Sequence, residues 1–174
     1  MKKIILALLS TFALLSTSQA QGFIGIDIGS NTLNSENGFE DTSPIYGFRA
    51  GSQSQDWRVY VGFNYFDSDD SDLTQYEMYV SADYIFTDDS QFLRPFIGGT
   101  VGFASTDYDF YEVDNSITWG GQAGLILNVD PNFNIEGGVK YMMFSMDITT
   151  AYPYEYYDVF DDKLTFYIGA NYKF

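Results

Sequence analysis

From residue 22 to residue 174 the chain repeatedly alternates apolar and polar residues, and this period of two limits its fold more than any other feature. The last segment is the clearest case, with Leu164, Phe166 and Ile168 on one face and Lys163, Thr165 and Gly169 on the other. Such alternation is typical of β-strands, whereas no window after Ala20 shows the helical period. We therefore predict an all-β protein with eight strands, at 22–29, 45–51, 58–65, 75–86, 94–103, 118–129, 135–141 and 163–174.

The connections between these segments alternate in length. Long or acidic connections are expected at 30–44, 67–73, 105–115 and 146–162, and short ones at 52–56, 87–92 and 130–132. In an antiparallel sheet the long connections then share one end and the short ones share the other, as in outer-membrane barrels. The segments also bracket the roughly 9 to 11 residues that a tilted strand needs to cross a bilayer. The fold class predicted is an eight-stranded antiparallel up-and-down transmembrane β-barrel.

The first twenty residues have the layout of a cleavable signal peptide. Lys2 and Lys3 precede an apolar stretch at 4–15, which ends in the small and polar residues 16–20. This stretch is shorter than the roughly 20 apolar residues of a membrane-spanning helix. We expect cleavage after Ala20, which leaves a single barrel domain at 21–174.

Alternation alone does not say which face of the sheet points outward, because a soluble lipocalin-like barrel has the same pattern with its apolar face inside. Four features favour the membrane arrangement: the signal peptide, the unequal connections, the glycines of the polar face and the aromatic C-terminus. The interior of an eight-stranded barrel is just wide enough for side chains, so a polar interior must mix glycines with a few long residues. Aromatic residues near the strand ends are expected at the two membrane interfaces.

The polar face carries both signs of charge. Two of the eight Lys and Arg residues lie in the leader, and the other six all fall on this face together with four acids. A charge that faced lipid near the midplane would cost about 2 to 4 kcal/mol, so pairing inside a closed barrel is favoured. We predict an interior charge network that includes Asp27, Arg49, Arg58, Glu77, Asp83, Arg94, Glu136 and Lys140.

Three segments carry a resemblance to a known family: 94–103 (RPFIGGTVGF), 120–125 (GGQAGL) and 166–174, which ends in an aromatic residue, one further residue and Phe. The chain resembles the small outer-membrane barrels that include OmpX and the transmembrane domain of OmpA, often described as porin-like or opacity-type proteins. The resemblance implies a bacterial outer-membrane location and assembly by the barrel-assembly machinery, with Tyr172 and Phe174 as the assembly signal. Because nothing follows Phe174, the single-domain, OmpX-like form is expected.

The composition argues against several classes of function. Histidine and cysteine are both absent, so the usual general base, disulfides and thiolate metal sites are missing. We therefore expect no catalytic residues, no enzyme activity and no cofactor. A net charge of −16 argues against nucleic-acid binding.

The long connections offer two candidate binding segments. Asp67, Asp69, Asp70 and Asp72 could hold a divalent cation weakly, although this segment lacks the central Gly of a calcium loop and has Met78 at its twelfth position. The other reading of these acids is a solvated acidic surface. Tyr152, Tyr154, Tyr156 and Tyr157 could bind a partner, or could extend the last two strands as a protruding sheet.

These observations predict a monomeric outer-membrane protein with envelope-structural and surface-interaction roles. Its expected partners are outer-membrane lipid and lipopolysaccharide, contacted directly, through cations or by adhesion. The alternative is a narrow pore or conduit for ions or small apolar molecules. The filled interior argues against a wide channel.

Overall fold

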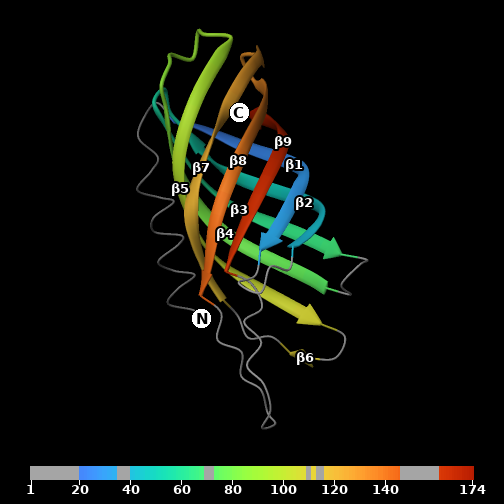
Figure 1. Ribbon diagram of the computed structural model, residues 1–174. Coiled ribbons are helices and arrows are strands. Elements are labelled where there is room, and N and C mark those ends of the chain that lie inside the picture. The colour runs from blue at the N-terminus through green and yellow to red at the C-terminus, as the bar shows by residue number, and fades with distance from the viewer. Residues whose placement is uncertain (1–19, 35–39, 69–72, 109–110, 113–115, 146–160) are drawn as a thin grey trace.

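The computed structural model describes residues 20–34, 40–68, 73–108, 111–112, 116–145 and 161–174. The predicted signal peptide therefore lies almost entirely outside the described residues. Eight long strands pair in chain order, and the pairing of the first with the last closes the sheet (Figure 1). The strands are β1 (Gln21–Asn34), β2 (Glu40–Gln53), β3 (Trp57–Ser68), β4 (Leu73–Ile85), β5 (Leu93–Tyr108), β7 (Ser116–Asp130), β8 (Phe133–Ser145) and β9 (Asp162–Lys173). A two-residue strand, β6 (Tyr111–Glu112), pairs only with the end of β5.

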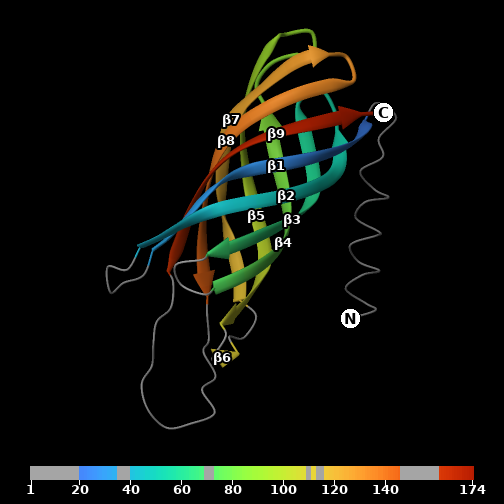
Figure 2. The same ribbon diagram turned by 90° about the vertical axis from the view of Figure 1, so that its right-hand side faces the viewer.

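Every pair of neighbouring long strands is antiparallel, which confirms the predicted eight-stranded up-and-down barrel. Short turns join β2 to β3, β4 to β5 and β7 to β8 at the end where the chain also finishes (Figure 2). In the last of these turns the carboxylate of Asp130 accepts a hydrogen bond from the backbone N–H of Asn132 at 3.1 Å. Within the described part of the chain, no helix is long and apolar enough to cross a membrane.

The strands are longer than the sequence predicted. They run for 12 to 16 residues, and several acids expected in loops belong to strands instead: Glu40, Asp41, Asp67, Asp107, Glu112 and Asp162. The prediction relied on apolar alternation, which stops where the wall leaves lipid. The backbone hydrogen bonds of a β-ladder need no apolar side chains and continue past that level.

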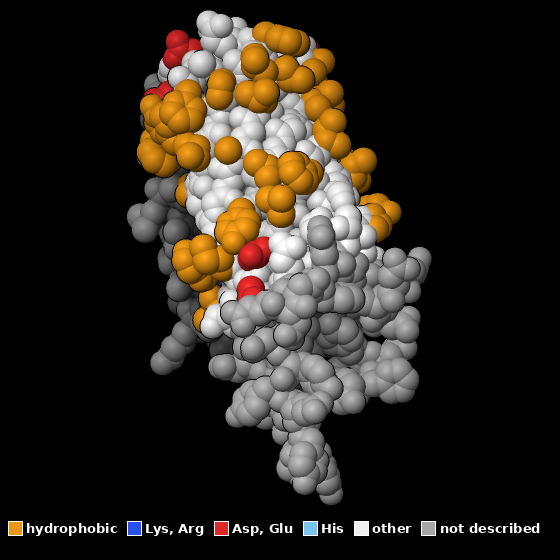
Figure 3. Space-filling model, viewed as in Figure 1, with side chains coloured by type: hydrophobic (Ala, Val, Ile, Leu, Met, Phe, Trp, Pro, Cys, Tyr) orange, Lys and Arg blue, Asp and Glu red, His pale blue; other side chains and the backbone are white. Residues whose placement is uncertain are grey.

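The apolar residues face outward and the charged residues face the lumen. In β1, Ile24, Ile26 and Ile28 are 45%, 63% and 56% exposed, whereas the alternate residues Phe23 and Asp27 are buried. All six Lys and Arg residues of the described chain are buried as well. On the face in Figure 3, apolar side chains gather along the wall and acids appear only towards its two ends. The membrane arrangement is therefore confirmed, and the soluble alternative is wrong.

Aromatic side chains mark both ends of this apolar wall. At the short-turn end the exposed rings of Trp57 and Tyr84 lie 5.2 Å apart between centroids, and Phe86 lies 5.2 Å beyond Tyr84. At the other end Tyr76 packs beside Tyr65, with 5.4 Å between their centroids. Rings with a polar edge suit the two membrane–water interfaces, which fixes how the barrel stands in a bilayer.

Candidate functional site

The central feature of the lumen is the carboxylate of Glu136, which projects inward from β8. Arg49 Nη1 donates to its Oε1 at 2.5 Å, and Arg58 Nη1 donates to its Oε2. Asn171 Nδ2 and Tyr167 Oη add hydrogen bonds at 3.0 and 3.3 Å. A fully buried carboxylate is thus bound by two guanidiniums, an amide and a phenol, as burial of a charge requires.

Each of the two arginines also holds a second carboxylate. Arg49 Nη2 lies 2.9 Å from Asp27 Oδ1, and Arg58 Nη2 lies 2.6 Å from Asp83 Oδ2. Glycine makes room for this cluster, because a Cβ at Gly47 would stand 3.2 Å from the Cβ of Asp27. We call Asp27, Arg49, Arg58, Asp83 and Glu136 the central cluster.

The central cluster crosses the lumen. In the closed strand order β3 and β8 are four strands apart in either direction, so Arg58 and Glu136 meet across the full width of the barrel. The guanidinium of Arg58 also lies over inward aromatic rings, 4.9 Å from the centroid of Phe96 and 5.1 Å from that of Tyr60. Ion pairs and packed rings therefore occupy the middle of the barrel, which is the condition expected for an eight-stranded lumen.

A second group of polar side chains lies nearer the long connections. Lys163 Nζ is 2.8 Å from Glu77 Oε2, and Asn64 donates to the same oxygen at 2.8 Å. Lys140 lies 3.6 Å above the centroid of the Tyr79 ring, a cation–π contact. Among the described residues no carboxylate is within ion-pair distance of Lys140.

Arg94 stands apart from both groups. Its buried side chain binds Asp89, the carbonyl of Thr87 at 3.0 Å and the carbonyl of Gln55 at 2.5 Å. These partners belong to two different short turns, so Arg94 ties the turns together at the end of the barrel. The predicted network residues are all buried, but they form three separate groups.

Several residues of these groups were missing from the predicted site. Gln122 donates to Asp83 and to Tyr60 Oη at 2.5 and 2.7 Å, and Asn171 accepts from Arg49 Nε at 2.9 Å. All of them occupy inward positions of the same period-two pattern. That parity was a usable signal, but the prediction considered only charged side chains.

The candidate binding segments are only partly within the described chain. Asp67 accepts hydrogen bonds from Tyr65 Oη at 3.1 Å and from Thr74 Oγ1 at 3.4 Å on the exposed face. Asp69, Asp70 and Asp72 lie outside the described residues, as does the tyrosine segment Tyr152, Tyr154, Tyr156 and Tyr157. The residues that are described contain no group of three or more potential metal ligands.

The predicted assembly signal forms the closing seam of the barrel. Tyr172 and Phe174 are 53% and 69% exposed on the outer wall. The N–H of Phe174 donates to the carbonyl of Gly22 at 2.9 Å, and the ring lies against Gly22, where a Cβ would stand 2.7 Å from Phe174 Cε2. The terminal aromatic residue is therefore free to contact lipid or another protein.

Comparison with known proteins finds solved structures of the same architecture. Neisserial surface protein A has a TM-score of 0.71 and 20% identity, over 89% of this chain and 99% of that one. Outer membrane protein H (OprH) from P. aeruginosa scores 0.61 at 24% identity, over 88% and 99%. Ail, the attachment invasion locus protein of Yersinia pestis, scores 0.56 at 18% identity, over 90% and 99%.

No family model matches the sequence, and no curated protein matches it. Identities this low establish the fold and leave the role open. The fold is that of small bacterial outer-membrane barrels, in agreement with the outward apolar wall.

Proposed function

We propose that this integral outer-membrane β-barrel is a structural and surface-interaction protein of the cell envelope, and that it neither catalyses a reaction nor conducts ions freely. The observation that carries the proposal is the contact of Arg58 with Glu136 across the lumen. A permeating ion would have to separate these buried charges. Separation leaves charges unpaired in a site of low dielectric, which is costly.

Electrical recording in planar bilayers tests this proposal. The purified barrel should give no stable single-channel steps. A variant with both central arginines shortened, Arg49→Ser with Arg58→Ser, removes the bridge across the lumen and shows whether the assay detects an opened barrel. Stable steps from the unaltered protein would favour the alternative, a narrow pore.

The end of the barrel with the long connections, here called the outer end, supports the surface-interaction part of the proposal. There the strands continue beyond the apolar wall and carry outward polar groups, among them Asp67 and Asp162, which accept hydrogen bonds from Tyr65 and Tyr141 at 3.1 Å each. Exposed tyrosines beside carboxylates offer both apolar area and hydrogen-bonding groups to a partner. This polar rim, formed by the strand ends next to the long connections, is better suited to contact with a neighbouring molecule than to catalysis.

The charge of the outer end indicates what kind of partner it fits. One structure of Ail contains a heparin analogue, sucrose octasulfate, which is a polyanion. In the present chain every described Lys and Arg is buried in the barrel, so the exposed surface offers acids to its surroundings. A polyanion such as lipopolysaccharide would therefore need divalent cations as bridges.

A further inference from the structure

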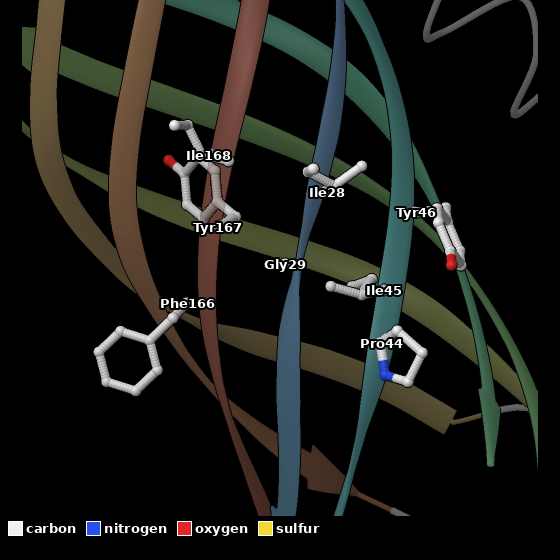
Figure 4. Close-up of a pocket in the computed structure, with 8 residues that line it drawn as sticks. All are labelled: Ile28, Gly29, Pro44, Ile45, Tyr46, Phe166, Tyr167 and Ile168. Atoms are coloured by element: carbon white, nitrogen blue, oxygen red, sulfur yellow. The ribbon is translucent and has the colours of Figure 1, made fainter. Parts of the chain in front are cut away.

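The outer wall has a hollow where β9, β1 and β2 lie side by side, next to the polar rim on its short-turn side (Figure 4). Its volume is about 470 Å³, within the roughly 300 to 1,000 Å³ typical of small-molecule sites. Ile28 and Ile168 stand on the side towards the short turns, and Phe166 and Pro44 stand on the side towards the long connections. Gly29, with no side chain, forms part of its floor.

Ser30 follows Gly29 in β1 and lies at the edge of the hollow, on the side towards the long connections. It pairs with Pro44 on one side and Phe166 on the other, so a small residue lies between two larger ones in the same outward row. Ser30 is exposed, and no hydrogen bond to its hydroxyl occurs among the described residues. An unpaired hydroxyl at the edge of an apolar, lipid-facing wall is unfavourable unless an external group bonds to it.

Further hydroxyls follow on the same face towards the long connections. The Oγ1 atoms of Thr32 and Thr42 are 3.0 Å apart and exposed. Beyond them Asn34 donates to Asp162 at 2.7 Å. The surface thus changes from apolar to hydroxylated to acidic over a short distance along β1.

We propose that this hollow holds one acyl chain of a membrane lipid, whose ester or amide carbonyl accepts a hydrogen bond from Ser30. The apolar part of the hollow is continuous with the lipid-facing wall, so an acyl chain already covers its surroundings. The acids beyond Thr32 and the absence of outward basic residues in the described chain disfavour a phosphate at this level. The uncharged linkage between acyl chain and head group is the part of a lipid that fits.

This inference rests on the membrane placement in the proposed function, and the lipid concerned lies in the leaflet next to the long connections. It goes further in expecting one retained lipid at a defined place. A wall with no specific site would contact lipid to the same extent at every position around the barrel.

Photo-crosslinking tests the inference. The full chain is reconstituted in phosphatidylcholine vesicles with a trace of phosphatidylcholine that carries a diazirine near one ester, and labelled peptides are mapped by mass spectrometry. Peptides of β1, β2 and β9 around the hollow should be labelled about three to ten times more than the outward wall of β4 and β5, the range that one added hydrogen bond supports. Equal labelling around the barrel would overturn the inference.

Two variants sharpen the test. Ser30→Ala removes the hydroxyl, and Ser30→Leu also places a large side chain at the edge of the hollow between Pro44 and Phe166, so both should lower the enrichment and the second should abolish it. Ser105→Leu makes the same change at a serine of β5 that pairs with Tyr76, and should leave the enrichment intact. Heat-modifiable migration on gels shows that each variant is folded. Absence of label from every outward peptide would instead contradict the membrane placement itself, and enrichment that survives Ser30→Leu in a folded barrel would refute the lipid site.

Discussion

Replacing Glu136 with Gln should destabilise the barrel markedly. The change keeps the shape of the side chain and one acceptor oxygen but removes the negative charge that Arg49 and Arg58 share. Removing one partner of a buried ion pair lowers the free energy of unfolding by roughly 3 to 5 kcal/mol. Arg49 keeps Asp27 and Arg58 keeps Asp83, so we expect the lower end, a decrease of about 3 kcal/mol in the free energy of unfolding.

Urea unfolding of the protein in lipid vesicles measures this change. Trp57 and Trp119 both lie on the outer wall, 56% and 52% exposed, so their fluorescence should shift when the barrel leaves the lipid. Asp161→Asn provides a matched control, because Asp161 is exposed and only its backbone forms hydrogen bonds among the described residues. The control should change stability by less than about 0.5 kcal/mol. An equally small effect of Glu136→Gln would refute the central cluster as a source of stability.

Three further predictions concern other parts of the molecule. Phe174→Ser should lower the amount of barrel in the membrane more than Phe86→Ser, since both aromatic residues are exposed at the short-turn end but only one closes the last strand; equal membrane levels would count against an assembly signal. Arg94→Gln should cost about 1 to 3 kcal/mol and speed hydrogen exchange in both turns, because Arg94 binds carbonyls of two turns; unchanged exchange in either turn would contradict this role. Millimolar calcium should protect the acidic connections from protease more than sodium at equal ionic strength, since coordination stabilises the form that binds; equal protection by the two salts would leave only a solvated acidic surface.

Side-chain parity was the part of the structure that the sequence could predict. Arg49, Arg58 and Glu136 occupy inward positions because every second residue of a strand faces the same way, and this rule needs no knowledge of neighbouring strands. Parity distinguished the membrane barrel from a soluble one only together with the signal peptide, the unequal connections, the glycines of the polar face and the aromatic C-terminus. Parity does not, however, predict which interior charges form ion pairs with one another.

The partners of individual charges depend on how strands are displaced along one another around the ring. Glu136 meets Arg58 because β8 and β3 face each other at that height, and alternation within each strand carries no information about height. Arg94 illustrates the same limit, since it was grouped with the interior charges but binds Asp89 and two carbonyls of the short turns. Ser30 was placed in a loop because polar residues follow it, so the hollow on the outer wall could not be anticipated.

The central cluster has a consequence for the order in which the barrel forms. Its arginines arrive on β2 and β3, early in the chain, whereas Glu136 and Asn171 arrive on β8 and β9. Until those last strands are in place, Arg49 and Arg58 lack the carboxylate that they share in the finished barrel. In an open, half-built sheet each arginine would have only one carboxylate partner, Asp27 for Arg49 and Asp83 for Arg58. Release into the bilayer is thus most favourable after the final strand has joined the first and Glu136 has reached both arginines.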